Sequence, residues 1–194
     1  MNADERRSRL LEQFVIHWEK LDGFSVDASL DPLASQFVTG QKNQFSERLW
    51  RPIPQTTDPS MLDPLYAKLP ARFPPLYEQL VLTCRWADVS LGSYRLIGNP
   101  LGPDLSGLLD KMLKDKFLSA CLLKNGYIPF GKGPDIDYDP VRFDLKSRKK
   151  NREFSIVKLD HEEILCVERI KVVAELAPTF EHLVKTTVEL ANRT

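Results

Sequence analysis

Residues 126–160 read GYIPFGKGPDIDYDPVRFDLKSRKKNREFSIVKLD and contain three short runs of β-forming residues. The runs are YIPF at 127–130, VRFDL at 141–145 and FSIVKL at 154–159, and glycine, proline or charged residues separate them. Short β-prone runs between turn-forming residues are typical of antiparallel strands. We therefore predict an antiparallel sheet in the second half of the chain.

Helical patterns surround these runs, because apolar residues recur there at the spacing of one helix face. The segments with this pattern are 4–21, 73–84, 105–117 after a capping Asp104, and the residues that follow Thr179. Further strands are predicted at 88–97 and 170–176. The regular alternation of strand and helix expected of a parallel sheet is missing, so the predicted fold class is α+β.

The first third of the chain is predicted to be a helical extension. Asp31-Pro32 has the form of a helix start, and two short helices would place Leu33, Phe37, Phe45 and Leu49 on one side. Prolines between 52 and 64 then interrupt regular structure. We assign residues 1–63 to an N-terminal extension packed on the domain, and residues 64–194 to the α+β domain itself.

Composition excludes several classes of function. The 27 basic residues balance the 27 acidic ones, whereas proteins that neutralise nucleic-acid phosphates usually carry a basic excess. No run of apolar residues is long enough to span a membrane, and no signal peptide is recognisable. Cys84, Cys121 and Cys166 are odd in number and have apolar neighbours, so we expect buried thiols in a cytoplasmic protein that binds neither nucleic acid nor membrane.

Motifs for metal binding and catalysis are incomplete. Asp135, Asp137 and Asp139 have the spacing of calcium ligands, but Pro140 and Lys146 stand where an EF-hand loop needs glycine and glutamate. His161-Glu-Glu begins like a zinc-protease helix but lacks the second histidine, and no activated-nucleophile motif occurs. We assign no catalytic residue, no metal site and no cofactor.

Several short motifs occur in an order that resembles the SUKH superfamily. They are Leu69-Pro70 before a helix, the run from Gly126 to Gly131, an acidic turn, 141–144, 156–162 and Ala177-Pro178-Thr179-Phe180-Glu181. The resemblance covers residue 69 to the C-terminus. It implies an antiparallel sheet flanked by helices and a non-enzymatic function, since many bacterial members bind and neutralise toxins as immunity proteins while others are scaffolds or regulators.

The predicted function is therefore protein binding, with a toxin as one class of partner. The expected contact residues form an exposed edge: Asp135, Asp137, Tyr138, Asp139 and Arg142. The basic loop 146–152 is interpreted as a solvated hairpin loop and a secondary contact. Two alternatives stay open: a regulatory scaffold that self-associates through its N-terminal part, and an enzyme in which Asp137, Asp139 and His161 converge. Oligomeric state is left open as well.

Overall fold

A computed structural model describes residues 3–22, 25–26, 34–42, 48–134 and 138–193. Its largest sheet has six antiparallel strands in the order β11-β10-β9-β8-β7-β6. Their bounds are β6 Val89–Ser90, β7 Arg95–Leu96, β8 Tyr127–Lys132, β9 Pro140–Asp144, β10 Ser155–Leu159 and β11 Val172–Ala177. The predicted α+β class and the antiparallel sheet are thus confirmed.

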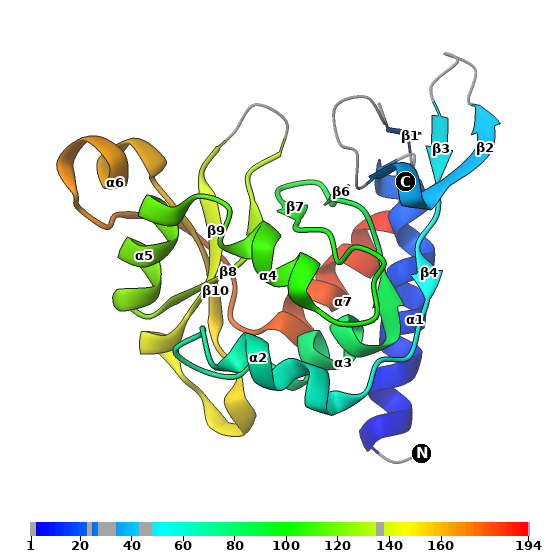
Figure 1. The fold of residues 1–194 in the computed structure, drawn as a ribbon, viewed down its shortest axis with the longest axis horizontal. Coiled ribbons are helices and arrows are strands. Elements are labelled where there is room, and N and C mark those ends of the chain that lie inside the picture. The colour runs from blue at the N-terminus through cyan, green and yellow to red at the C-terminus, as the bar shows by residue number, and fades with distance from the viewer. Residues whose placement is uncertain (1–2, 23–24, 27–33, 43–47, 135–137, 194) are drawn as a thin grey trace.

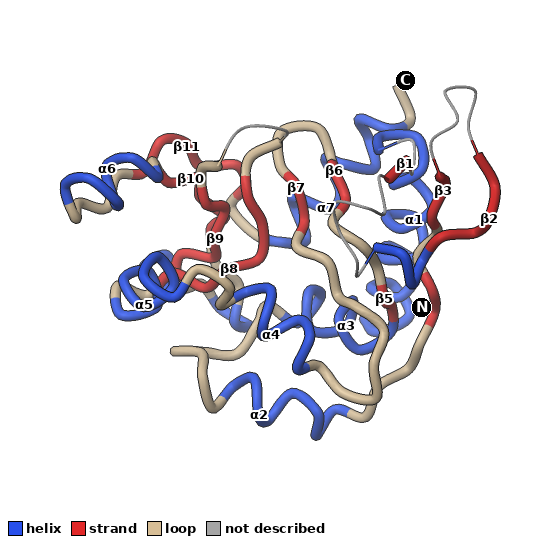
Figure 2. Tube along the Cα trace, turned by 45° about the horizontal axis from the view of Figure 1, so that its top comes forward, coloured by secondary structure: helices blue, strands red, loops and turns tan. Residues whose placement is uncertain are grey.

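Helices cover both faces of this sheet (Figures 1 and 2). On one side lie α1 (Ala3–Asp22), α3 (Pro75–Thr83) and α7 (Phe180–Ala191). On the other side lie α5 (Lys116–Lys124) and α6 (His161–Val167). Two more helices, α2 (Asp63–Tyr66) and α4 (Ser106–Met112), pack on the main core through Leu65, Leu108 and Met112. The arrangement is a three-layer α/β/α stack in which β8 and β9 are the central strands.

The larger core lies between the sheet and the first group of helices. Alternate residues of β9, Val141 and Phe143, are fully buried there, and Phe143 lies opposite Ile128 of β8 and Ile156 of β10. An aromatic cluster fills the same layer, with ring centroids 4.5–6.4 Å apart; its members include Phe14, Tyr77, Phe130, Phe143 and Phe180. This cluster joins α1, α3 and α7 to the sheet.

A second core lies under α5 and α6. Leu122, Ile164 and three strand residues, Tyr127, Val157 and Leu159, are buried in it. Because β10 contributes apolar residues to both faces, it is a buried strand, not a strand with one solvated face.

The N-terminal part contains the predicted helix, but the residues after that helix differ from the prediction. Instead of the two expected short helices, the described part of this segment forms a 3₁₀ turn at Ala34–Phe37 and the strands β1 (Ser25–Val26), β2 (Val38–Lys42) and β3 (Arg48–Trp50). The expected helix start at Asp31-Pro32 and the side chain of Phe45 lie outside the described residues. Strand β4 (Ile53–Pro54) then pairs with β5 (Cys84–Arg85).

Two other segments are divided where one element was expected. The predicted helix at 105–117 is α4 followed by α5, because Asp115 accepts a hydrogen bond from the Leu118 amide at 2.9 Å and caps a new helix. This new start leaves Phe117 half exposed. The strand expected at 88–97 is the hairpin β6–β7, whose turn includes Gly92 at a φ of +77°. The helix after Thr179 is confirmed, with Thr179 as its N-cap.

The cysteines differ in their surroundings. Cys84 is buried as expected, Cys121 is partly exposed and Cys166 is exposed on α6. The expectation of three buried thiols is therefore wrong for Cys166. All three are free thiols. Among the described residues no helix is both long and apolar enough to cross a bilayer.

Candidate protein-binding surface

The turn between β8 and β9 holds the residues expected to contact a partner. Tyr138 is 66% exposed, and Asp139 lies beside it with 18% of its side chain exposed. Asp135 and Asp137 lie outside the described residues. Among the predicted contact residues, the structure therefore places Tyr138 and Asp139 together at the surface.

Arg142 does not lie on this exposed edge, which corrects the prediction. Its residue is 6% exposed, and its guanidinium donates hydrogen bonds to the Gly131 carbonyl at 2.7 Å and to the Val141 carbonyl at 2.9 Å. Burial lowers the pKa of Arg142, and Asp115 partly opposes that shift. Because the second helical layer covers this face of β9, an arginine that looks exposed in a two-layer fold is buried here.

Asp139 joins the turn to the start of α6. Its Oδ1 lies 2.7 Å from His161 Nδ1 and accepts a hydrogen bond from the His161 amide at 3.0 Å. Its Oδ2 lies 3.7 Å from Lys158 Nζ on β10. The predicted approach of Asp139 and His161 is thus present, whereas Asp137, the third member of that set, cannot be included because it lies outside the described residues. No group of three or more metal-ligating side chains occurs among the residues described.

An exposed strip continues from this turn along α6. The rings of Tyr138 and His161 meet edge to face with centroids 6.1 Å apart. Leu165 follows His161 by four residues, so both side chains lie on the same face of the helix. Leu165 is 47% exposed, and Val167 at the end of the helix is 62% exposed. Tyr138 therefore lies against the start of α6, and the partly exposed His161 and the exposed Leu165 follow on one face of the helix.

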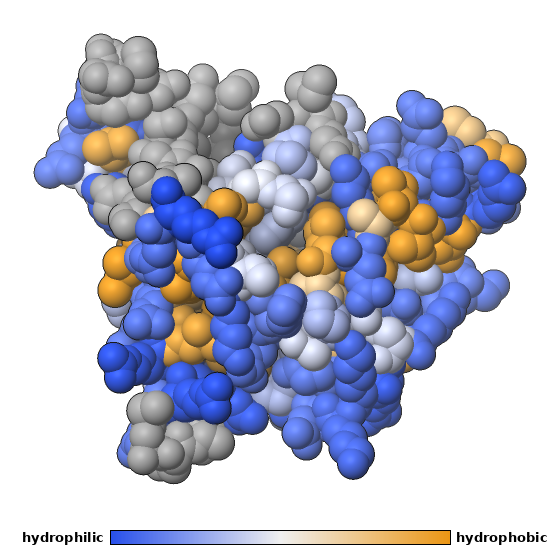
Figure 3. Space-filling model, turned by 180° about the vertical axis from the view of Figure 1, so that it is seen from behind, coloured by the Kyte–Doolittle hydropathy of each residue, from blue (hydrophilic) through white to orange (hydrophobic). Residues whose placement is uncertain are grey.

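Strand β11 extends the apolar surface to the edge of the sheet. It is the outermost strand beside β10, and Val172 and Val173 are 47% and 49% exposed. Figure 3 shows hydrophobic side chains gathered over this side of the molecule. We call the surface made by Tyr138, His161, Leu165, Val167, Val172 and Val173 the α6–β11 surface.

Carboxylates outnumber cations around this surface. Residues 158–175 hold five acidic and three basic residues, and Asp139 adds a sixth carboxylate. All three cations are paired with carboxylates: Lys171 with Asp160 at 3.0 Å, Arg169 with Glu163 at 2.7 Å and Lys158 with Asp139 at 3.7 Å. Glu162 and Glu168 are exposed. The rim of the α6–β11 surface is therefore acidic.

The sequence contains a short signal for α6, which is the pattern of a helix N-cap. Asp160 accepts a hydrogen bond from the Glu163 amide at 3.1 Å and caps the helix, and Glu168 ends it in a left-handed conformation at a φ of 54°. An Asp followed three residues later by Glu is a sign of a helix start. This pattern could have identified α6, and with it the exposure of Leu165 and Val167. The exposed valines of β11 carry no such signal, since a buried strand has the same composition.

No protein-family model, curated protein or solved structure matches this chain.

Proposed function

We propose that this chain is a non-catalytic protein-binding module that engages its partner through the α6–β11 surface. The observation that carries the proposal is the group of four aliphatic side chains on α6 and β11, each 47–62% exposed, together with Tyr138. Exposed aliphatic side chains gathered in one region of the surface, with a polar rim, are typical of protein interaction sites. Tyrosine adds an amphipathic ring of the kind enriched at interface centres.

The acidic rim indicates the partner's chemistry. Complementary charge speeds encounter and selects between partners, so a protein with basic residues around an apolar patch fits this surface best. The resemblance to the SUKH superfamily makes an immunity function the specific form of the proposal, with a basic toxin as the partner. An apolar centre would then supply affinity while the carboxylates supply orientation.

Side-chain docking accounts for the surface better than addition of a partner strand to β11. The pairing of β10 with β11 shifts register between Ile156 and Val157 and again between Lys158 and Leu159. Such bulges twist an edge strand and discourage strand addition. Contacts are therefore expected through side chains of both α6 and β11.

Affinity capture from the native host tests the proposal. The double variant Leu165→Glu/Val173→Glu places charge in the centre of the surface, and Ile16→Glu on α1, at a residue 69% exposed, is the matched control. We expect one partner to be recovered with wild type and with the control but not with the double variant. Recovery of the same proteins by all three baits would contradict the proposed surface.

The immunity form of the proposal has its own test. The captured partner is expected to be toxic when expressed alone and harmless when expressed with the wild-type chain. The double variant should fail to protect, and the Ile16→Glu variant should protect fully. A partner that is not toxic would leave the binding surface intact but rule out the immunity function, in favour of a scaffold.

Acid–base catalysis is a second candidate, favoured by the contact between Asp139 and His161. A carboxylate that holds Nδ1 of a histidine can orient its Nε2 toward a substrate. The same Asp139 oxygen, however, also accepts the His161 amide, which is what anchoring of the turn to α6 requires. Because anchoring explains both contacts and catalysis explains one, we rank catalysis second.

A further inference from the structure

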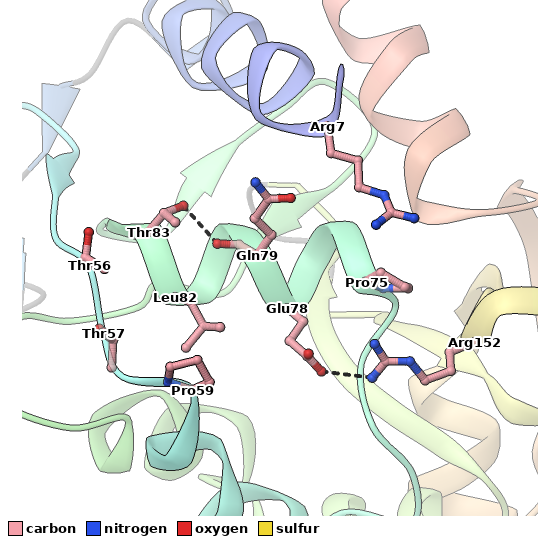
Figure 4. Close-up of a pocket in the computed structure, with 10 residues that line it drawn as sticks. All are labelled: Arg7, Thr56, Thr57, Pro59, Pro75, Glu78, Gln79, Leu82, Thr83 and Arg152. Carbon is pink, nitrogen blue, oxygen red and sulfur yellow. Dashed lines mark hydrogen bonds and ion pairs between the residues drawn. The ribbon is translucent and has the colours of Figure 1, made fainter. Parts of the chain in front are cut away.

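A pocket of about 380 Å³ lies between α1, residues 56–59, α3 and the loop that joins β9 to β10 (Figure 4). Its charged side chains already interact within the chain. Arg152 donates a hydrogen bond to Glu78 at 3.1 Å, and Arg7 lies close enough to Glu153 to favour its ionised form. The lining therefore indicates no charge for a ligand, and the contacts that do indicate a binding role lie on the α6–β11 surface.

Asp139 connects three elements beside the α6–β11 surface. Its Oδ1 accepts a hydrogen bond from the His161 amide at 3.0 Å and lies 2.7 Å from His161 Nδ1, at the start of α6. Its Oδ2 lies 3.7 Å from Lys158 Nζ on β10. Its backbone carbonyl accepts a hydrogen bond from the Gly133 amide at 2.8 Å, directly after β8. Both the side chain and the backbone of Asp139 are therefore fixed at the point where β9 begins.

Tyr138 and Asp139 differ in their access to a partner. Tyr138 is 66% exposed, whereas only 18% of the Asp139 side chain is exposed. The Tyr138 ring meets the His161 ring edge to face, with centroids 6.1 Å apart. The histidine that Asp139 holds is therefore the one that contacts the exposed tyrosine.

A turn held in this way lowers the cost of binding. Ordering a mobile side chain or loop at an interface reduces affinity, and a surface that is ordered in advance avoids that loss. The contacts of Asp139 provide this order before a partner arrives. Tyrosine is enriched among the residues that contribute most to interfaces, so the position of Tyr138 matters to a partner.

We propose that Asp139 is a positioning residue for the partner: it fixes the turn between β8 and β9 on α6, so that Tyr138 already has its binding position in the free chain. This inference rests on the proposed function of the α6–β11 surface. An exposed carboxylate of the rim acts on a partner by its charge, whereas Asp139 acts through the position of Tyr138. Its role requires an acceptor oxygen for the His161 amide, and an asparagine side chain also provides one.

Three variants of the full-length chain separate position from charge. Asp139→Ala removes the acceptor and the charge, whereas Asp139→Asn keeps an acceptor and removes the charge. Glu162→Ala is the control, because it removes an exposed rim carboxylate from α6. Each purified variant is titrated with the protein that the wild-type chain captures, and ¹⁵N relaxation of the Tyr138 amide is measured in the free chain.

We expect Asp139→Ala to weaken binding by about tenfold, because the complex then bears the cost of ordering the turn and its tyrosine. In the same variant the order parameter of the Tyr138 amide should fall from about 0.85 to below about 0.6. Asp139→Asn and Glu162→Ala should each stay within about threefold of the wild-type affinity, the effect expected of one exposed charge, and Tyr138 should stay ordered in both.

Equal weakening by Asp139→Ala and Asp139→Asn would assign Asp139 to the charged rim and overturn the inference. A wild-type affinity of Asp139→Ala, or a wild-type order parameter for Tyr138 in that variant, would overturn it as well. Each of these results would leave the proposed surface intact. Failure of the wild-type chain to capture any protein, or equal capture by the Leu165→Glu/Val173→Glu variant, would instead remove the proposed function and this inference with it.

Discussion

Glu153 illustrates how single residues set the electrostatics of this fold. Its carboxylate accepts a hydrogen bond from the Phe180 amide at 3.3 Å, at the start of α7. Burial raises the pKa of Glu153 above its ordinary value of 4.5, and Glu181 raises it further. The folded state therefore favours the protonated form of this residue more than the unfolded state does.

The pH dependence follows from this direction. As pH rises above 4.5 and through the raised pKa, the carboxyl ionises in a folded state that disfavours the charge, so the free energy of unfolding falls. Glu153→Gln keeps the acceptor and removes the ionisation, and it should flatten this decline. Urea unfolding between pH 4.5 and 7 measures the decline in the free energy of unfolding, and Glu162→Gln at an exposed position of α6 is the control. A decline of wild-type size in Glu153→Gln would refute the assignment.

Residue patterns predicted part of the candidate site. Tyr138 and Asp139 could be placed at a surface turn because proline, glycine and acidic residues surround them. Arg142 could not, since alternation along β9 indicates only which residues share a face and not whether a helix covers that face. Its burial depends on α5, whose start at Asp115 was hidden inside an apparently continuous helical pattern.

At the scale of elements, the central strands were predictable and the short ones were not. Strands β8, β9 and β10 have β-branched and aromatic residues between clear turn signals. In contrast, β4 to β7 are two residues long, too short for a period to appear. Strand β3 has a composition that also suits the helix expected there, because Leu49 and Trp50 occur in either structure.

The pairing of β7 with β8 leads to a prediction about packing. A Cβ atom added at Gly131 would lie 2.8 Å from the Arg95 carbonyl oxygen, and neither backbone can move without disturbing strand pairing. Gly131→Ala should lower the free energy of unfolding by about 1–3 kcal/mol. Gly102→Ala is the control, since its nearest contact would be 3.7 Å away. Equal stability of the two variants in urea would show that the close approach of Gly131 to the Arg95 carbonyl does not exclude a side chain.

The cap of α6 yields a prediction about the proposed surface. Asp160 accepts the Glu163 amide and pairs with Lys171, so it holds both the start of α6 and the start of β11. Asp160→Ala should speed hydrogen exchange of the amides of residues 161–167 severalfold, with little change in the remaining helices. Asp110→Ala on α4 is the control. Unchanged exchange in α6 would show that its cap does not stabilise it.

At the scale of the whole molecule, α1 is part of the main core. Phe14 and Trp18 are fully buried, and their rings contact Phe180 and Trp86 respectively. Phe14→Ala should lower the free energy of unfolding by about 3–5 kcal/mol, the usual cost of a buried aromatic truncation. Ile16→Ala, on the exposed side of the same helix, should cost less than about 0.5 kcal/mol. Similar losses in both variants would argue against the packing of α1 on α7.

The overall layering could be anticipated only in part. The sequence indicates helices on either side of the sheet segment along the chain, but which face each helix covers follows from long-range contacts. Residue 53 pairs with residue 85, and Thr57 donates its amide to the Leu82 carbonyl at 2.7 Å. Such contacts have no local signature, and they bring the N-terminal third against the rest of the fold.

The same layering leaves α6 and β11 at one end of the molecule, and the central claim is that a protein partner binds there. Hydrogen exchange of the chain, free and with its captured partner, tests this claim most directly. We predict protection of amides in residues 138–139 and 160–176, with little change in loop 146–152. Protection confined to the basic loop or to α1, with residues 160–176 exchanging as in the free chain, would contradict it.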